Sequence, residues 1–293
     1  MTGVLWAAVA GVGFGLFQSV NRASIEDLDV YRSTFIQLVV SAVILSAATA
    51  FSGDLARLRS IPFAALVSFA VAGMVHFFVG WTLLNASQKR LGAARTSPLI
   101  ATTPLFGAVI AAVTLGETPG VVTVIGIATI VAGVCAVALG RRGTRTVRWN
   151  DAVFGLGTAT CWAISPIFIR RGLERFDRPL AGVTISMLAA VAAYGVAMLA
   201  RGRHAAPAAS ASRTAITWKL AAGALVGLST WARWYALSLA SVAAVLGLAL
   251  LSVPTVMVLA PLLVGRDHER VTRSVVAGAG LVIAGALVII ANP

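Results

Sequence analysis

Residues 63–86 read FAALVSFAVAGMVHFFVGWTLLNA, without a single Asp, Glu, Lys or Arg side chain. A helix needs about 20 mainly apolar residues to cross the hydrocarbon core of a bilayer. This run has that length and composition, and the chain contains further runs like it. The ten predicted spans are Val4–Val20, Tyr31–Phe51, Phe63–Ala86, Ala93–Leu115, Val121–Leu139, Ala152–Phe168, Leu180–Ala200, Trp218–Leu239, Val242–Val264 and Val275–Ala291.

The composition of the whole chain agrees with this interpretation. Of its 293 residues, 59% are hydrophobic and only 11% are charged, and the mean hydropathy is +0.92, whereas a soluble domain has about 25% charged residues. A soluble enzyme would expose large apolar patches, and a disordered chain would lack this apolar content, so both classes are excluded. Because the alternating pattern of barrel strands is also absent, the sequence predicts an all-α polytopic membrane protein.

The net charge of +13 does not point to nucleic acid as a partner. The Lys and Arg side chains lie mostly in the short joins between apolar runs, and the sequence lacks a basic groove interleaved with aromatic residues. We therefore interpret the charge as a signal of membrane topology. Most of it lies in the odd-numbered joins, so the positive-inside rule places these joins in the cytoplasm and both chain ends outside.

The two halves of the sequence can be superimposed with a shift that grows from 148 to 152 residues. The pairs that coincide are Arg22 with Arg170, Glu26 with Glu174, Asp29 with Asp177, Gly73 with Gly223, Trp81 with Trp231, Ala86 with Ala236, Pro104 with Pro254, Glu117 with Glu269, Gly126 with Gly278 and Gly133 with Gly285. Each half holds five predicted spans, and an odd number makes the second half enter the membrane from the opposite side. The sequence thus predicts two units, residues 1–146 and 147–293, that form a 5+5 inverted repeat of ten transmembrane helices.

Four motifs of the first half resemble one known family. They are Trp81-Thr-Leu-Leu-Asn-Ala-Ser-Gln-Lys89, Ser97-Pro-Leu-Ile-Ala-Thr-Thr-Pro104, Leu115-Gly-Glu-Thr118 and the pair Gly126 and Gly133. An aromatic helix end, a proline-bearing helix, a Gly-Glu turn and a glycine-spaced last helix, in this order, look like the EamA repeat of the drug/metabolite transporter (DMT) superfamily. The second half repeats the order at Trp234–Ser238, Pro254 and Gly278 to Gly285, but separates Gly265 from Glu269.

The resemblance covers nearly the whole chain and implies a bundle of ten helices around a central solute cavity. It implies a transporter that moves metabolites by alternating access. We expect a secondary transporter in the cytoplasmic (inner) membrane, and Arg233 together with the dipoles of the kinked helices favours a small polar metabolite, such as an amino acid or an organic acid. We expect a monomer or homodimer whose partners are the solute and the lipid bilayer. The family also implies that both chain ends lie inside the cell, opposite to the charge count, but both interpretations put the two ends on one side.

Interrupted helices in matching positions of two halves are the best sequence pointer to a transporter site. Pro104 and Pro254 lack an N–H group, so we expect the carbonyls of Ile100 and Leu250 to lose their helix partners at two such kinks. The nearby hydroxyl groups that are candidates for solute binding belong to Thr102, Thr103, Ser252 and Thr255. The alternative is a merely kinked helix in which the hydroxyls bond to carbonyls of their own helix.

Arg233 lies inside a predicted span, in the segment Ser229–Tyr235. A charge at the centre of a membrane helix costs about 2.5–3.5 kcal/mol, so such residues usually serve a function. One interpretation makes Arg233 an anion receptor in the wall of a cavity, since its fork suits a carboxylate or a phosphate. The other places it in the aromatic belt, with its side chain reaching the headgroups.

Four more residues inside spans complete the candidate solute site. A histidine side chain ordinarily titrates near neutral pH, so His76 is a candidate for coupling transport to protons, or else it is a neutral hydrogen-bonding residue of the bundle. Gln18 and Gln37 are candidates for the cavity wall, although amides in membranes usually bond between helices. Trp162 is a candidate apolar wall of the cavity, with packing or a place in the aromatic belt as the alternative.

The sequence contains no pattern of an enzyme or of a cofactor site. The nucleotide-binding loop Gly-x-x-x-x-Gly-Lys-Ser/Thr and the zinc motif His-Glu-x-x-His are absent, and the ten carboxylates avoid the middle of every span. We therefore expect no catalysis, no metal and no cofactor, and the position of the carboxylates argues against an exchanger of protons for cationic drugs. A membrane-embedded lipid-handling protein or enzyme that uses the same bundle is the alternative function, and a non-transporting membrane partner is a third.

Overall fold

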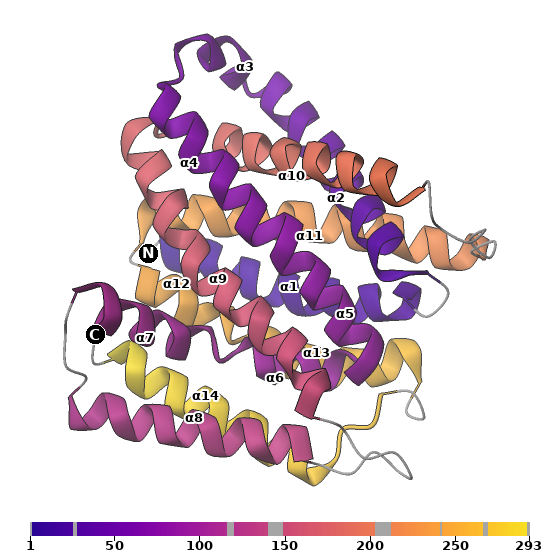
Figure 1. Ribbon diagram of the computed structural model, residues 1–293, viewed down its shortest axis with the longest axis vertical. Helices are drawn as coiled ribbons and strands as arrows, with labels where there is room; N and C mark the ends of the chain where they lie inside the picture. The colour runs from indigo at the N-terminus through magenta and orange to yellow at the C-terminus, as the bar shows by residue number, and fades with distance from the viewer. Residues whose placement is uncertain are drawn as a thin grey trace.

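The computed structural model describes residues 2–25, 28–115, 120–139, 149–202, 212–240, 242–265 and 269–291. Within these residues every regular element is a helix, which confirms the all-α prediction (Figure 1). Most of the long helices cross the molecule between the same two sides. Both chain ends lie on one of these sides, at the left of Figure 1, as both topology interpretations expect.

Each of the ten predicted spans coincides with a helix or with consecutive helices. The first half forms α1 (Thr2–Ile25), α2 (Val30–Phe51), the short α3 (Asp54–Arg57) and η1 (Leu58–Ser60), then α4 (Phe63–Gly73), the π-helical η2 (Met74–Gly80), α5 (Trp81–Leu91), α6 (Ala93–Ile100), α7 (Thr103–Leu115) and α8 (Val121–Leu139). The second half forms α9 (Trp149–Arg175), α10 (Pro179–Gly202), α11 (Arg213–Leu239), α12 (Val242–Ala249), α13 (Ser252–Val264) and α14 (Arg273–Ala291).

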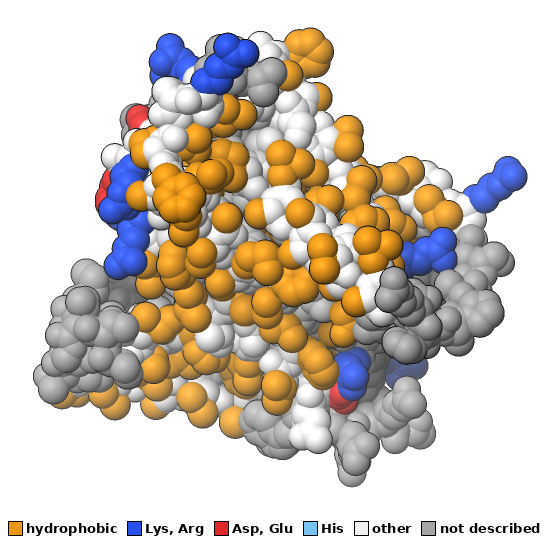
Figure 2. Space-filling model, turned by 45° about the horizontal axis from the view of Figure 1, so that its top comes forward, with side chains coloured by type: hydrophobic (Ala, Val, Ile, Leu, Met, Phe, Trp, Pro, Cys, Tyr) orange, Lys and Arg blue, Asp and Glu red, His pale blue; other side chains and the backbone are white. Residues whose placement is uncertain are grey.

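The molecule exposes apolar side chains and buries polar ones. Six described helical stretches are long and apolar enough to cross a membrane: Thr2–Ile25, Val30–Phe51, Phe63–Leu91, Asn150–Arg175, Pro179–Ala200 and Val245–Val264. Leu199 is 78% exposed, whereas Asn85 and Lys219 are completely buried. Figure 2 shows apolar side chains across the middle of one face and Lys and Arg side chains toward its edges. Lipid selects this distribution, so the chain is a multi-pass membrane protein.

Local signals in the sequence set the helix boundaries. Asp29 caps α2, because its side chain accepts hydrogen bonds from the backbone N–H groups of Tyr31 and Arg32, and Ser212 caps α11 in the same way. Gly92 lies between α5 and α6 with a φ of +83°, a conformation that costs glycine little. This glycine lets the chain reverse direction within a single residue.

Helices from the two halves pack closely against one another through glycine. A Cβ atom at Gly133 in α8 would lie 2.6 Å from the carbonyl oxygen of Gly278 in α14, and one at Gly285 would lie 2.6 Å from that of Gly126. The sequence superposition matches Gly126 with Gly278 and Gly133 with Gly285. When each glycine is replaced by its match, the contact of Gly133 with Gly278 becomes the contact of Gly285 with Gly126, so we call this pattern a partner exchange. The two helices are antiparallel, since residue numbers rise along one while they fall along the other. A two-fold relation between the helices produces this pattern.

Two membrane segments are interrupted in matching positions, slightly before the predicted prolines. Helix α6 ends at Ile100 and α7 begins at Thr103, while α12 ends at Ala249 and α13 begins at Ser252. Pro104 and Pro254 therefore lie in the first turns of new helices, where a missing N–H group costs nothing. The carbonyls that we expected to lack partners find others: the Thr103 hydroxyl donates to Ile100 at 2.7 Å, and the Val253 N–H donates to Leu250 at 3.0 Å.

Candidate functional site

A small cavity lies in the interior, where the two interrupted segments meet α1, α9 and α11. Its volume is about 40 Å³. Its walls are formed by Phe14, Gln18, Ile100, Ala101, Thr103, Pro104, Trp162, Arg233, Leu246, Ala249, Leu250 and Ser252. The structure thus brings six predicted residues together at one cavity, from both halves of the chain: Gln18, Thr103, Pro104, Trp162, Arg233 and Ser252.

The interruptions in the two segments face this cavity. The residues on both sides of each break, from Ile100 to Pro104 and from Ala249 to Ser252, include most of the lining from α6, α7, α12 and α13. The amino ends of α7 and α13 carry partial positive charge, and the carboxyl ends of α6 and α12 carry partial negative charge. The cavity therefore presents backbone dipoles of both signs to a small polar molecule.

Arg233 gives the cavity its charge. Its side chain is only 4% exposed, so it does not reach the headgroups, and the aromatic-belt interpretation is wrong. Among the described residues no carboxylate pairs with the guanidinium, and its Nε atom has no hydrogen-bond partner. A buried, unpaired guanidinium is costly, because it has lost its water and gained no counter-charge. The arrangement suits a ligand that supplies the missing anion.

Gln18 and Trp162 also line the cavity, and each carries a buried polar atom without a partner among the described residues. The Gln18 Oε1 atom and the Trp162 Nε1 atom are buried and lack hydrogen-bond partners in the described part of the chain. Trp162 also packs edge-to-face against Phe14, with ring centroids 5.7 Å apart. The Trp162 Nε1 atom lies on the side of η2, since a Cβ atom at Gly80 would be 2.9 Å from it. The cavity lining thus combines an amide side chain and a positive charge with an aromatic wall, which is typical of sites for small polar ligands.

His76 lies behind the cavity wall. Its ring stacks on Trp162, with centroids 5.2 Å apart and planes inclined by 11°. Its Nδ1 atom is 2.7 Å from the Ser165 hydroxyl oxygen, and Arg233 is near enough to interact with it electrostatically. His76 belongs to the π-helical segment η2, and such segments often occur at functional sites. The contacts place His76 where it can orient Trp162.

Three other predicted site residues lie away from the cavity lining. Thr102 donates to the carbonyl of Leu99 at 2.7 Å, and Thr255 donates to that of Leu251 at 2.8 Å, which is the back-bonding that the alternative interpretation described. Pro254 is exposed on α13. The sequence located the interruption correctly but did not show which side of each helix faces inward.

Gln37 belongs to a separate group of buried polar residues, which we call the polar cluster. Its members are Asn21, Thr34, Gln37, Asn85, Gln88 and Lys219, and every one is completely buried. The Lys219 ammonium donates to Asn21 Oδ1 and, at 2.9 Å, to Gln37 Oε1. Asn21 in turn donates to Asn85 and Gln88, and Asn85 donates to Thr34. Lys219 is the second residue of the predicted span Trp218–Leu239, and only its burial reveals that it belongs to this cluster.

A second buried arrangement, the Glu269 clamp, joins the two halves beside this cluster. The Glu269 carboxylate accepts a hydrogen bond from Arg22 Nε at 2.6 Å. It also accepts the backbone N–H groups of Ala93 and Ala94, at 3.0 and 3.1 Å, and so caps the amino end of α6. A side chain at Gly92 would collide with the carboxylate, because a Cβ atom there would lie 2.5 Å from Glu269 Oε1.

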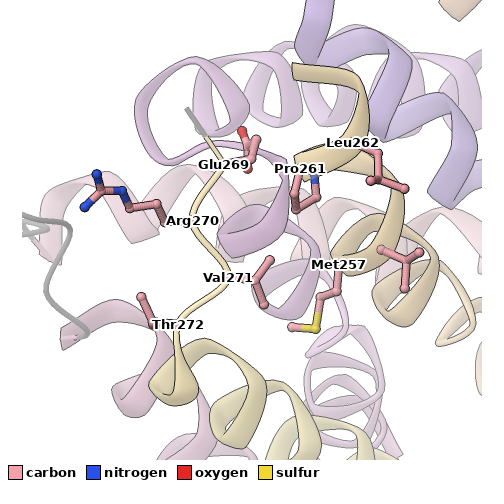
Figure 3. A pocket seen from close by; sticks show the side chains of 8 residues that line it. Met257, Pro261, Leu262, Glu269, Arg270, Val271 and Thr272 are labelled. Carbon is pink, nitrogen blue, oxygen red and sulfur yellow. The ribbon is translucent and has the colours of Figure 1, made fainter. Parts of the chain in front are cut away.

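A second, wider hollow lies elsewhere and has a different character. It has a volume of about 600 Å³ and lies between α13 and the segment Glu269–Thr272 that leads into α14 (Figure 3). Its α13 side includes Val258 and Leu262, which are 61% and 67% exposed and face outward. No predicted site residue lines it. We therefore assign the candidate site to the interior cavity. The residues described also contain no cluster of His, Cys, Asp and Glu that could hold a metal ion.

Comparisons with known proteins agree with this architecture. The model of the EamA-like transporter family matches residues 1–139 and again residues 150–291. Among solved structures, 18 chains match, and one of them, described only as the crystal structure of a protein, is 17% identical. That match has a TM-score of 0.60 and covers 96% of this chain and 95% of the other, so it shows a shared fold alone. No curated protein sequence matches.

Proposed function

The chain belongs to the EamA-like transporter family of the DMT superfamily, and from this premise we propose that it moves a small polar metabolite across the cytoplasmic membrane by alternating access. The observation that carries the proposal is the interior cavity with an unpaired guanidinium, Arg233, in its wall. An ionisable residue inside a membrane bundle marks a solute or ion pathway by default.

The charge of the site favours an anionic or zwitterionic solute such as an amino acid or an organic acid. A guanidinium binds a carboxylate through two parallel hydrogen bonds. Gln18 lines the cavity and its Oε1 atom has no partner in the described part of the chain, so in this proposal it accepts a hydrogen bond from an ammonium or hydroxyl group of the same molecule. Because the described lining residues contain no Asp or Glu, a purely cationic solute would meet Arg233 without compensation.

The proposal of alternating access rests on an organisation of the chain into two units, residues 1–146 and 147–293. The partner exchange between the α8 and α14 glycines supports a two-fold axis in the membrane plane, as an inverted repeat requires. A cavity of about 40 Å³ is far smaller than the pockets of about 300–1,000 Å³ that hold ligands. Solute binding therefore requires the helices around the cavity to separate, first toward one side of the membrane and then toward the other.

The proposal is tested by binding and by flux. Purified protein is screened by thermal shift against amino acids, organic acids and the corresponding uncharged amides. We expect carboxylates to raise the melting temperature and their amides not to, because only a ligand that binds the folded state shifts the equilibrium. Binders are then tested for uptake into proteoliposomes.

Arg233→Gln is the decisive variant. We expect it to reduce solute affinity at least about tenfold, since it removes a charge-assisted pair from a dry site, and Arg233→Lys to retain part of the binding. Arg170→Gln changes an exposed Arg and serves as the control. Unchanged uptake by Arg233→Gln would remove Arg233 from the site, and binders that are never transported would contradict the transport proposal.

A further inference from the structure

The polar cluster and the Glu269 clamp lie between the cavity and one end of the bundle. Along α1, Gln18 lines the cavity, and Asn21 and Arg22 follow one turn later. Along α6, the clamp holds the first residue, Ala93, and the last, Ile100, lines the cavity; the helix between them is about 12 Å long. Both groups therefore lie toward the right in Figure 1, where α1 ends and α11 begins.

The contacts of both groups run between the two halves of the chain. Lys219 from the second half is bonded to Asn21 and Gln37 from the first. Glu269 from the second half is bonded to Arg22 and to the start of α6 from the first. Any movement that separates the halves at this end must break these bonds.

Water molecules can take over the hydrogen bonds of the polar cluster and of the Glu269 clamp when the two halves separate. When a hydrogen bond within the protein is exchanged for one to water, the free energy changes little. When two apolar side chains separate, their hydrocarbon surface is exposed to water, and this costs free energy. The Lys219 ammonium donates to the neutral amide oxygens of Asn21 and Gln37, and it forms no ion pair with a carboxylate in the described ranges. Its ammonium gains hydration when water enters, so Lys219 favours opening, while the Glu269 clamp favours closure.

The opposite end of the bundle is sealed differently. In the superposition of the halves, Lys219, Asn21 and Gln37 coincide with Phe69, Ile169 and Ile185. Phe69 is completely buried, and its ring fills the space beside two glycines, since a Cβ atom at Gly172 would lie 2.3 Å from it. At the three superimposed positions the repeat thus carries polar side chains at one end of the bundle and apolar side chains at the other.

We propose that the polar cluster and the Glu269 clamp form the gate that closes this end of the solute pathway, an inference that rests on the proposed function. The clamp holds the gate shut by tying the α13–α14 connection to the start of α6. Lys219 is the residue that water reaches when the gate opens.

The test measures thiol labelling without any solute, so its result is independent of whether a solute has been identified. In full-length protein with Cys135 and Cys161 replaced by Ala, Ser33→Cys reports on the gate and Ala181→Cys reports on the matching position at the other end. Both positions are completely buried, and Ser33 lies one helical turn before Gln37 on α2. We expect both reporters to react slowly with a water-soluble maleimide.

Glu269→Gln is expected to accelerate labelling of the gate reporter at least about tenfold, because it breaks a buried ion pair, and to leave the Ala181→Cys reporter unchanged. Arg22→Gln should act in the same way, whereas Arg170→Gln, at the superimposed exposed position, should change neither reporter. Equal acceleration of both reporters would mean that the clamp stabilises the whole bundle, and no acceleration would mean that it closes nothing; either result overturns the proposal.

Lys219→Met supplies a variant with the opposite expected sign. Met has a similar length but no charge to hydrate, so labelling of the Ser33→Cys reporter should become slower than in the parent protein. Faster labelling would show that Lys219 holds the cluster together instead of favouring its hydration, and would overturn the role assigned to it.

Discussion

Trp162 lines the interior cavity and stacks on His76, and this contact bears on the two roles that the sequence left open for the histidine. His76 is 1% exposed and is absent from the cavity lining. Its bond to Ser165 fixes the ring against Trp162. Under the proposed function, these contacts favour His76 as a positioning residue that acts on the solute through the indole of Trp162.

We predict that His76→Phe keeps transport but weakens solute affinity about 3- to 10-fold, the range expected when an aromatic pair is retained and its orienting hydrogen bond is lost. The measurement is solute affinity and proton-driven accumulation in proteoliposomes, with Ser165→Ala as the matched variant, expected to show a similar loss. Complete loss of accumulation driven by a proton gradient, with downhill exchange intact, would instead assign proton coupling to His76.

At the scale of single residues, the sequence showed which side chains carry charge or polar groups better than it showed how deeply each side chain is buried. Arg233 stood out because a charge inside an apolar run is conspicuous, but only its 4% exposure distinguishes a cavity wall from a headgroup contact. Lys219 was missed because a Lys near the start of a helix usually reaches water. Its burial depends on α1 and α2 crossing over it, and such crossings between distant segments leave no local trace in a sequence.

At the scale of helices, a prediction concerns stability at the crossing of α8 and α14. Gly278 has the Gly133 carbonyl oxygen 2.7 Å from the place of an added Cβ atom, whereas Gly280, on the same helix, has nothing within 4 Å. We predict that Gly278→Ala destabilises the protein by about 1–3 kcal/mol through overpacking. Gly280→Ala should leave stability unchanged or raise it by up to about 1 kcal/mol through helix propensity. Thermal unfolding in one detergent compares the two, and equal melting temperatures would contradict the close crossing.

The helices themselves were largely predictable, and their irregularities were predictable only in part. All ten apolar runs became helical, because lipid leaves the backbone few other ways to satisfy its hydrogen bonds. The interruptions occur near Ala101 and Leu250, just before the prolines that indicated them, since Pro fits the first turn of the following helix. The π-helical segment η2 had no signal of its own, because Met74–Gly80 reads as ordinary apolar helix.

For the whole molecule, the family and the two halves could be predicted from motifs spread along the chain. The side chains that close the two ends of the bundle could not be predicted in this way. The superposition of the halves matched Arg22 with Arg170, yet one is buried beside Glu269 and the other is exposed. A two-fold repeat in sequence therefore coexists with different chemistry at the two ends. That difference arises from side chains that meet only after folding.

The orientation in the membrane is the prediction that belongs to this scale. The positive-inside rule places the odd-numbered joins, and with them the proposed gate, in the cytoplasm. In the cysteine-free protein, Arg213→Cys marks the gate end and Arg59→Cys marks the other, and both positions are exposed. We expect a membrane-impermeant maleimide to label Arg59→Cys in intact cells, but Arg213→Cys only after permeabilisation. The reverse pattern would put the gate on the outer side and both chain ends inside, as the family resemblance implies, and would show that the Arg-rich joins do not determine the topology here. Labelling of both variants in intact cells would contradict the assignment of the two joins to opposite sides of the membrane.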